Sequence, residues 1–536
     1  MNYYTKGSFK MKKRILSLIV SLALLTALLP RSVLCENADV SALPMQRNAP
    51  VWDGSTATSF AGGNGTENDP YLISNGAELA YFAHIVNDAV FNTEGLYFAL
   101  TADIYLNDIS NVSSWTENNA PANVWTPIGY NTYEIIDDFN IRVRDENAFK
   151  GLFDGRGHTV HGVYVKTLRN NDGFAPYQEG SGLFGSSHYS SFLDLRLANS
   201  FIFSETSSVG GIVGWHYRGG LSMGVGYAVK GCLVEESVRV IGYQNVAGIV
   251  GFANCSHATI TECVNRGTIS GNNGIGGIAG GAPQRTSDKL VIKSCMNEGT
   301  VTAEVNFSGD AYSAGGIVGW ITGDIEQCAN YGTISSKRVA GGIVGDTDEA
   351  CFVTDCYNAG TVTAEYEAGG IVALVLPANT INRCYNAGTV GAPDSAGALI
   401  GAAYDPNSLT VNNCYYLNTS CPQADSFCGT PLTAAQLQNQ SSYVGFDFNS
   451  IWTMDGDESY TYAELQSIPQ FDTATVLPGD LDGNGSISIA DAVLALRCAM
   501  GILTPTSKQI AAGDMDGDGS ISIAEAVLIL RAAMGL

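Results

Sequence analysis

Two segments near the C-terminus carry oxygen-bearing side chains at the spacing of a calcium-binding loop. Each has Asp or Asn at loop positions 1, 3 and 5, serine at position 9 and a carboxylate at position 12, and glycine at position 6 allows a sharp turn. Hard oxygen ligands at this spacing select Ca²⁺, so the sequence predicts two bound calcium ions. Serine at position 7 offers its backbone carbonyl. The first site comprises Asp480, Asp482, Asn484, Ser486, Ser488 and Asp491, and the second comprises Asp514, Asp516, Asp518, Ser520, Ser522 and Glu525.

These loops lie in a duplicated segment, residues 479–501 and 513–535, in which 18 of 23 aligned positions are identical. The spacing predicts a helix after each loop, over residues 492–500 and 526–534. Pro478, Gly479 and Gly513 predict little helix before the loops. Because empty loops crowd carboxylates together, we expect this segment to need calcium in order to fold.

The paired loop–helix segment resembles a type I dockerin, the module that attaches exported proteins to the cohesins of a scaffoldin. The resemblance covers residues 479–536 and implies a cohesin partner. It also implies that loop positions 10 and 11 and the following helix face the cohesin. These positions are Ile489, Ala490, Leu496 and Arg497 in the first half and Ile523, Ala524, Leu530 and Arg531 in the second. The near-identity of the halves implies that either one serves as the binding face.

A second pattern, Gly followed by two apolar residues and another Gly, recurs through the middle of the chain at intervals of 26 to 39 residues from Gly151 onward. Most units also carry Cys-x-Asn-x-Gly-Thr, as at Cys263, Asn265 and Gly267. Each unit predicts a short strand, a turn and a second short strand, and a period of this length predicts the coils of a right-handed β-solenoid (β-helix), an all-β fold. The small all-α calcium module would follow it.

Stacked coils place equivalent residues directly above one another. We therefore expect the Cys column to face inward as small hydrophobic side chains and the Asn column to hydrogen-bond from coil to coil. Cys421 and Cys428 lie outside the column and predict a local disulfide.

The glycine motif and its period resemble the GLUG repeats of secreted bacterial proteins, and the resemblance extends over about residues 51–467. It includes a lead-in with an apolar helix-like stretch, residues 78–86, and a closing segment from Leu432 to Trp452. The expected division is a signal peptide (1–35), an N-terminal cap with lead-in coils (36–150), the repeats (151–414), a C-terminal cap (415–475) and the dockerin (476–536). The GLUG family implies no single activity.

Charge and targeting limit the partners. The 27 Lys+Arg and 52 Asp+Glu give a net charge of −25, which argues against nucleic acid and anionic membrane surfaces. Lys12, Lys13 and Arg14 precede an uncharged stretch over residues 15–29, which predicts a secretory signal, and no later segment is long and apolar enough to span a membrane. We expect a secreted, extracellular protein that its dockerin holds at a scaffold or cell surface.

No catalytic motif is recognisable, so catalytic residues stay unknown and an enzyme is the less favoured class. No His-Glu-x-x-His, Gly-x-Ser-x-Gly or phosphate loop occurs. Asp346 and Asp348, near Lys337 and Arg338, are the acids that a catalytic solenoid would use, but single acids are also common in turns.

The position after the glycine motif holds Trp215, Phe252 and Trp320, which would stack on sugar rings if exposed or pack under loops if not. The sequence favours a solenoid that adheres to, or binds, a polysaccharide or host glycan and is attached to a cellulosome-like scaffold. The alternative is a β-helical polysaccharide lyase or glycoside hydrolase.

Overall fold

The computed structural model describes residues 50–137, 140–168, 180–217, 228–254, 258–283, 289–304, 312–348, 350–421, 428–454, 460–469, 479–481, 487, 489–503, 505, 507–515 and 520–533. The predicted signal peptide lies outside these residues. The chain divides into two compact units, Ala49–Phe471 and a second that contains Asp472–Leu536.

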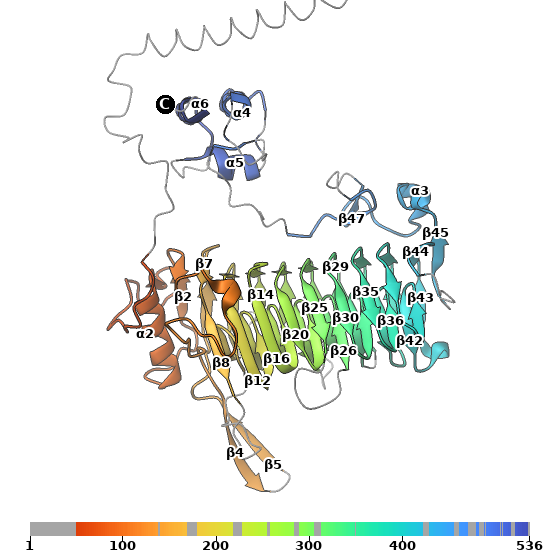
Figure 1. Cartoon of the computed structure of the whole chain (residues 1–536), viewed down its shortest axis with the longest axis horizontal. Helices are drawn as coiled ribbons and strands as arrows, with labels where there is room; N and C mark the ends of the chain where they lie inside the picture. Colours follow the sequence, from red (N-terminus) through yellow and green to blue (C-terminus); the bar gives the residue numbers. More distant parts are fainter. Residues whose placement is uncertain are drawn as a thin grey trace, which may run out of the picture. The chain divides into compact units, whose positions relative to one another are not determined.

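The larger unit is a parallel β-solenoid, in which one coil contains five short strands (Figure 1). A representative coil runs through β18 (Thr259–Thr261), β19 (Val264–Asn265), β20 (Thr268–Gly271), β21 (Asn273–Gly276) and β22 (Ala279–Ala282). Each strand pairs in parallel with its equivalent in the next coil. The solenoid prediction is confirmed, whereas its right-handedness stays a prediction.

The prediction of two strands per repeat was wrong, because the chain turns at more places than the Gly and Asn positions indicated. Residues with positive φ that are not glycine form the corner before the Cys column, as at Glu262 (φ 56°) and Asp355 (φ 53°). A left-handed residue turns the chain sharply, and at these corners it divides the coil into further strands.

Sheet 1 and sheet 2 meet at that corner. Sheet 1 contains β1 (Tyr71–Ile73), β2 (Tyr97–Leu100), β6 (Leu152–Asp154), β10 (Ser191–Leu193), β14 (Ala228–Lys230), β18, β23 (Leu290–Lys293), β28 (Gly323–Glu326), β33 (Phe352–Thr354), β38 (Thr380–Asn382) and β43 (Thr410–Asn412). Sheet 2 contains β3 (Ile104–Tyr105), β7 (Thr159–His161), β11 (Arg196–Ala198), β15 (Leu233–Val234), β19, β24 (Met296–Asn297), β29 (Ala329–Asn330), β34 (Tyr357–Asn358), β39 (Tyr385–Asn386), β44 (Tyr415–Leu417) and β45 (Thr430–Leu432).

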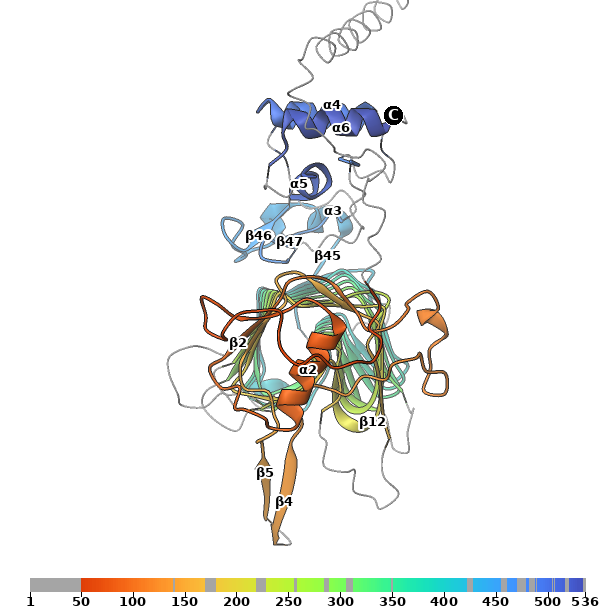
Figure 2. The same ribbon diagram turned by 90° about the vertical axis from the view of Figure 1, so that its left-hand side faces the viewer.

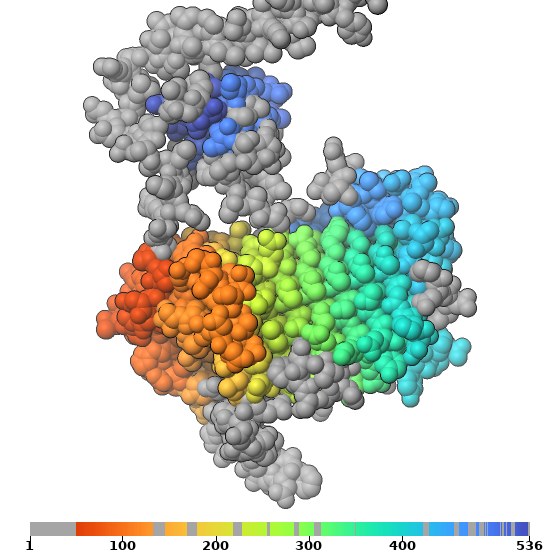
Figure 3. All heavy atoms as spheres, viewed as in Figure 1, coloured from red at the N-terminus to blue at the C-terminus, as the bar shows by residue number. Residues whose placement is uncertain are grey.

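Sheet 3 and sheet 4 complete the coil. Sheet 3 contains β8 (Tyr164–Thr167), β12 (Phe201–Gly210), β16 (Arg239–Ala247), β20, β21, β25 (Thr300–Ala303), β26 (Ser313–Gly315), β30 (Ile334–Ser336), β31 (Val339–Gly341), β35 (Val362–Ala364), β36 (Glu367–Gly369), β40 (Val390–Gly391) and β41 (Ser395–Gly397). Sheet 4 contains β9 (Phe184–His188), β13 (Val213–Tyr217), β17 (Val250–Asn254), β22, β27 (Val318–Ile321), β32 (Val344–Thr347), β37 (Val372–Val375) and β42 (Ile400–Ala403). In Figure 3 the side chains of successive coils form regular parallel bands.

A helix closes the N-terminal end of the solenoid. Helix α2 (Gly76–Asn87), which confirms the predicted helix, lies across that end (Figure 2). The Asn75 side chain caps the helix by accepting a hydrogen bond from the Glu78 amide. On the buried face of the helix, the ring centroids of Phe82 and Phe98 are 4.5 Å apart. An apolar helix covers core edges that would otherwise be open to water and to other chains. A short 3-10 helix, η1 (Val112–Ser114), and an antiparallel hairpin of β4 (Thr132–Asp137) and β5 (Asn140–Arg144) lie between β3 and β6.

The Cys and Asn columns occupy the interior as predicted. The Cys side chains from Cys232 to Cys384 have no exposed surface, and Cys414 has 3%. Along the Asn column, each Nδ2 donates to the Oδ1 of the next coil at 2.7–2.8 Å, in the order Asn265, Asn297, Asn330, Asn358 and Asn386. Both predictions are confirmed, since the Cys side chains pack in the apolar interior and the Asn side chains bond from coil to coil.

The predicted disulfide between Cys421 and Cys428 is not formed, since Cys428 carries a thiol. Both side chains pack against the apolar core of the last coils instead. Burial raises the pKa of the Cys428 thiol to about 12, so it is protonated at neutral pH.

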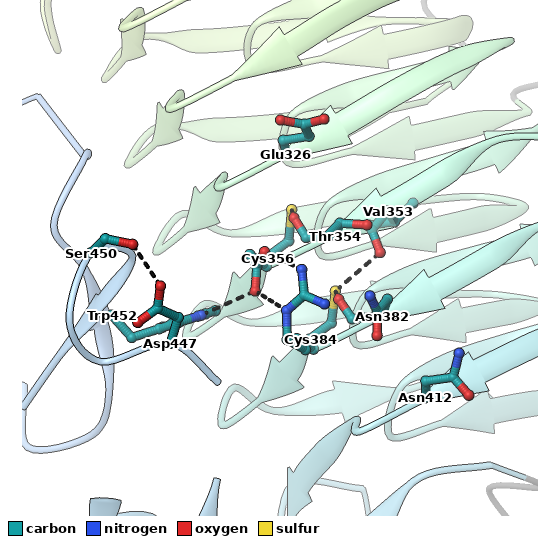
Figure 4. Close-up of polar contacts among 12 residues, drawn as sticks. Glu326, Val353, Thr354, Cys356, Asn382, Cys384, Asn412, Asp447, Ser450 and Trp452 are labelled. Atoms are coloured by element: carbon teal, nitrogen blue, oxygen red, sulfur yellow. Dashed lines mark hydrogen bonds and ion pairs between the residues drawn. The ribbon is translucent and has the colours of Figure 1, made fainter. Parts of the chain in front are cut away.

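The C-terminal cap folds back over the outer side of sheet 2. It contains helix α3 (Ala434–Leu437), the 3-10 helix η3 (Gln440–Ser442) and the antiparallel pair β46 (Trp452–Thr453) and β47 (Glu464–Leu465); a further 3-10 helix, η2 (Pro406–Ser408), precedes β43. Figure 4 shows Trp452 pointing toward the corner near Cys356 and Cys384. There Asp355, 3% exposed, accepts from the Trp452 indole at 3.1 Å and from two nitrogens of Arg383 at 2.7 Å each.

Replacing Asp355 should loosen the cap. Asp355→Ala removes the acceptor that Arg383 and Trp452 share. Leaving the buried Trp452 indole and the half-buried Arg383 without it costs about 3 kcal/mol. We expect urea unfolding of the full chain to show that loss. The matched variant Asp394→Ala, at an exposed acid of the solenoid, should change stability by less than about 0.5 kcal/mol. Equal midpoints for the two variants would show that this contact does not hold the cap.

Candidate functional site

The smaller unit is helical within its described residues. Helices α4 (Ile489–Ala499) and α6 (Ile523–Ala533) follow the loops, which confirms the predicted helices within the described residues. Ala495 on α4 and Ile529 on α6 are fully buried. They belong to one apolar cluster with Leu481, Ala492, Cys498, Ala512, Ile521 and Ala526.

The expectation of little helix before the second loop was wrong. Helix α5 (Ser507–Gly513) precedes that loop, because the residues between Ser507 and Gly513 are good helix formers and only Gly513 interrupts them. The Asp514 amide donates to the Ile510 carbonyl at 2.8 Å and extends this turn. The Gly479 amide donates to the Ala512 carbonyl at 2.7 Å, so the end of α5 also positions the start of the first loop.

Three of the four carboxylates at loop positions 1 and 12 are withdrawn from solvent. Asp491 has no exposed surface, Glu525 is 3% exposed and Asp480 is 8% exposed. Glu525 accepts from the amides of Met515 and Ser522, each at 2.6 Å, and so connects the two ends of the second loop. Burying ionised carboxylates is costly unless a cation balances them. Their oxygen chemistry and burial therefore fit a bound calcium ion, which would supply the missing positive charge.

The other predicted ligands divide into two groups. Asp514 and Ser522 are half-buried and Ser520 is exposed. The remainder, Asp482, Asn484, Ser486, Ser488, Asp516 and Asp518, lie outside the described residues, within which no three His, Cys, Asp or Glu side chains are arranged to hold a metal.

Many of the residues expected to face a cohesin are on the surface. Ile489 and Ile523 expose 49% and 57% of their surface. Ala524, Arg497 and Arg531 are also exposed, whereas Leu496 and Leu530 are half-buried against the apolar cluster, and the side chain of Ala490 lies outside the described residues. The exposed apolar residues Val493 and Ile502, 42% and 62%, were not predicted. Apolar side chains gathered on a small domain are typical of a protein-binding surface.

The aromatic residues after the glycine motif form a row on sheet 4. In register, Trp215 pairs with Phe252, Phe252 with Gly281 and Gly281 with Trp320. The ring centroids of Trp215 and Phe252 are 6.3 Å apart, as are those of Phe252 and Trp320. Trp215 is 5% exposed, whereas Phe252 and Trp320 are half-buried. Of the predicted platform, Phe252 and Trp320 thus present ring surface.

Trp320 is held by two glycines and one hydrogen bond. A Cβ added at Gly274 or Gly281 would lie 2.7 Å or 2.4 Å from the indole ring, so the ring lies against both backbones. Its Nε1 donates to Asn245 Oδ1 at 2.8 Å. A ring fixed in this way loses little conformational entropy when a ligand stacks on it. The sequence did not indicate this contact, because Asn245 and Trp320 are 75 residues apart.

The acids considered for catalysis lie next to this row. Asp346 follows Trp320 in register, and burial, with Asp348 and Glu367 nearby, raises the pKa of Asp346 to about 7. Asp348 is exposed and accepts from the Thr322 hydroxyl at 3.0 Å. Arg338 lies over the Tyr312 ring at 5.2 Å and lowers the pKa of Asp346 in part.

Sequence patterns also missed a buried serine–histidine pair. Ser187 Oγ lies 2.8 Å from His216 Nδ1, on neighbouring strands β9 and β13. Burial, with His188 nearby, lowers the pKa of His216 to about 4, so the ring is neutral at pH 7. Their exposures, 0% and 2%, leave no access for a substrate, so the pair is a satisfied polar contact of the core.

Comparison with known proteins identifies the smaller unit. Residues 478–532 match the model of the Dockerin type I domain. Type I dockerin domains bind calcium and have a cohesin as their partner, and proteins that contain them are typically extracellular and attached to a scaffoldin. Among the described residues, no helix combines the length and the apolar character that a membrane crossing needs.

Two further comparisons give weaker similarities. A segment of 112 residues is 30% identical to a proposed Gly-rich membrane protein of Evansella cellulosilytica, covering 21% of this chain and 10% of that protein. The chain therefore spans about a tenth of the length of that relative. A crystal structure of a proposed immunoglobulin A1 protease from Bacteroides ovatus superposes with a TM-score of 0.39 and 18% identity, over 76% of this chain and 95% of that one.

Proposed function

We propose that this protein is a secreted component of a cellulosome-like complex, in which the dockerin attaches a glycan-binding or adhesive β-solenoid to a scaffoldin. The row of Phe252 and Trp320 carries the glycan-binding half of the proposal. A flat, half-buried ring held against the backbone is the kind of surface on which the CH groups of a sugar stack.

The same proposal includes the repeat type, the number of calcium ions, the cohesin contacts and the domain boundaries. The repeats are of GLUG type, the dockerin holds two calcium ions, and Ile489, Arg497, Ile523 and Arg531 contact the cohesin. The domains divide at residues 35, 150, 414 and 475. Support comes from the burial of Asp491 and Glu525 and from the exposure of the two isoleucines.

Trp320→Ala should weaken binding of the full chain to its polysaccharide about tenfold, since one aromatic contact is worth about 1 kcal/mol or slightly more. Affinity electrophoresis against neutral and acidic polysaccharides measures the loss. Phe352→Ala is the matched control, because Phe352 is an exposed aromatic residue, 45%, on sheet 1. Equal losses in both variants would place binding outside the row.

The second candidate function is a polysaccharide-cleaving enzyme. Asp346 favours it, because a carboxyl group with a pKa of about 7 beside a tryptophan can donate a proton at neutral pH. Mass spectrometry of plant, starch and mucin polysaccharides incubated with the protein separates the two functions. New oligosaccharides that Asp346→Asn abolishes would establish the enzyme, whereas intact polymers would leave a binding module.

A further inference from the structure

On sheet 4, the residue next to Trp320 in the following coil is Asp346, whose carboxyl group has an oxygen without a hydrogen-bond partner among the described residues. Asp346 on β32 pairs with Trp320 on β27, so the two residues are one strand spacing, about 4.8 Å, apart. Asp346 Oδ1 is buried, and no donor within the described part of the chain reaches it. Leaving a buried acceptor unpaired costs free energy. The Asp346 side chain as a whole is half-buried, so part of the residue stays open to a ligand that lies on the Trp320 ring.

Sheet 3 provides the opposite side of this position. Trp320 donates to Asn245 on sheet 3, which shows that this column of sheet 4 faces that part of sheet 3. Along sheet 3, Ser313 pairs with Val339 and Val339 with Glu367. The charged groups that act on Asp346 are Asp348 from the end of its own strand, Glu367 from β36 and Arg338 before β31. The surroundings of Asp346 are therefore partly apolar and mainly acidic.

We propose that Asp346 and Trp320 together form a sugar-binding subsite that takes a neutral sugar unit of a polysaccharide and rejects a uronic acid. This inference rests on the proposed glycan-binding function and names its ligand class. Trp320 supplies the stacking face, and Asp346 accepts hydrogen bonds from sugar hydroxyl groups.

The charges select the class of sugar. Hydroxyl groups donate to a carboxylate without adding charge, and hydrogen bonds to an ionised acceptor are stronger than neutral ones. A uronic acid would bring a second carboxylate close to Asp346, Asp348 and Glu367, with Arg338 in opposition. Like charges at such distances repel, most strongly at low ionic strength.

The pKa of Asp346, raised to about 7 mainly by burial, adds a testable pH dependence. Sugar hydroxyls that donate to the carboxylate stabilise its ionised form, so affinity should rise between pH 6 and pH 8. Arg338 opposes the shift, and Asp348 and Glu367 reinforce it.

The test measures binding of the full chain to xylan, β-glucan and glucomannan as neutral probes and to polygalacturonate as the acidic probe. Asp346→Asn should weaken binding of the preferred neutral probe about tenfold at pH 8 and abolish the rise with pH. Asp394→Asn, which removes one exposed acid elsewhere on the solenoid, should leave both unchanged.

A second measurement shows that the Asp346→Asn variant is folded. Burying the charged carboxyl group destabilises the native protein once pH exceeds its unfolded pKa. The melting temperature of Asp346→Asn should therefore exceed that of the wild type by a margin that grows from pH 4 to pH 7 and then levels off.

The outcomes separate this subsite from the proposed function. Loss of binding in Trp320→Ala but not in Asp346→Asn would overturn the subsite and leave glycan binding in place. Tighter binding of polygalacturonate than of any neutral probe would overturn the ligand class. Binding of no polysaccharide by the wild type would overturn glycan binding and the subsite with it.

Discussion

Removal of calcium is expected to unfold the dockerin and to release the protein from its cohesin, while the solenoid stays folded. Asp491 and Glu525 are almost wholly buried in a unit whose apolar cluster is small. Without a cation, these buried negative charges would lie in a medium that screens them poorly. At a free calcium concentration about 1,000 times the dissociation constant, each site would contribute about 4 kcal/mol.

Calorimetry of the full chain with and without a chelator measures this effect. The low-stability transition of residues 472–536 should disappear, and the transition of residues 49–471 should keep its temperature. Cohesin binding, followed by titration calorimetry, should fall below detection and return when calcium is added. A dockerin transition that persists in the chelator would show that the buried carboxylates do not need the ion.

Glu525→Ala is expected to impair the second calcium site without chelation. It removes a predicted ligand and the acceptor for the Met515 and Ser522 amides. Since the two halves are nearly identical, the first half should still bind the cohesin, but at a lower melting temperature. Asp394→Ala again serves as the control for a lost acid.

The second large effect is expected at the centre of the asparagine column, where Asn330→Ala should lower the free energy of unfolding of the solenoid by about 4 kcal/mol. Asn330 uses all four of its hydrogen-bonding positions, with Asn297, Asn358 and both the amide and the carbonyl of Gly332. Alanine leaves those partners buried and unpaired, and each such group costs about 1 kcal/mol or more.

Two control variants make this prediction specific. Among the described residues, Asn386 accepts from Asn358 but donates only to the Gly388 carbonyl. Asn386→Ala therefore leaves fewer partners unpaired and should cost less. Asn412 is exposed on β43, and Asn412→Ala should have little effect. Urea unfolding measures all three. Equal losses at Asn330 and Asn412 would show that the column does not stabilise the coil.

The repeat pattern predicted the interior of the solenoid, because burial in a stacked coil allows few side chains. Cys and Asn at fixed offsets were expected to face inward. There the hydrogen-bonding groups of each Asn side chain pair with the Asn of neighbouring coils and with the glycine two residues later. The spacing that predicts the calcium loops is also local, because it lies within twelve residues, and the family match at residues 478–532 agrees with that prediction.

Contacts between distant coils could not be predicted in this way. The position of Trp320 depends on Gly274 and Gly281, which provide space because they lack side chains, and on Asn245, two coils earlier. The contact of Asp355 with Trp452 depends on how the cap returns over sheet 2, and no periodicity carries that information. The helix α5 was missed because Gly513, directly before the second loop, outweighed a short run of helix formers.

The returning cap determines how the solenoid carries a mechanical load. Along the cap, Tyr415 contacts Phe446, Asp355 holds Trp452, and Tyr331 donates to Glu464, so the chain leaves the solenoid several coils before its last one. Tension applied through the dockerin would therefore act first on Glu464 and peel the cap contact by contact toward Tyr415. The last coil would bear force only after the cap has detached. The cap would therefore absorb a first load before the solenoid begins to unfold.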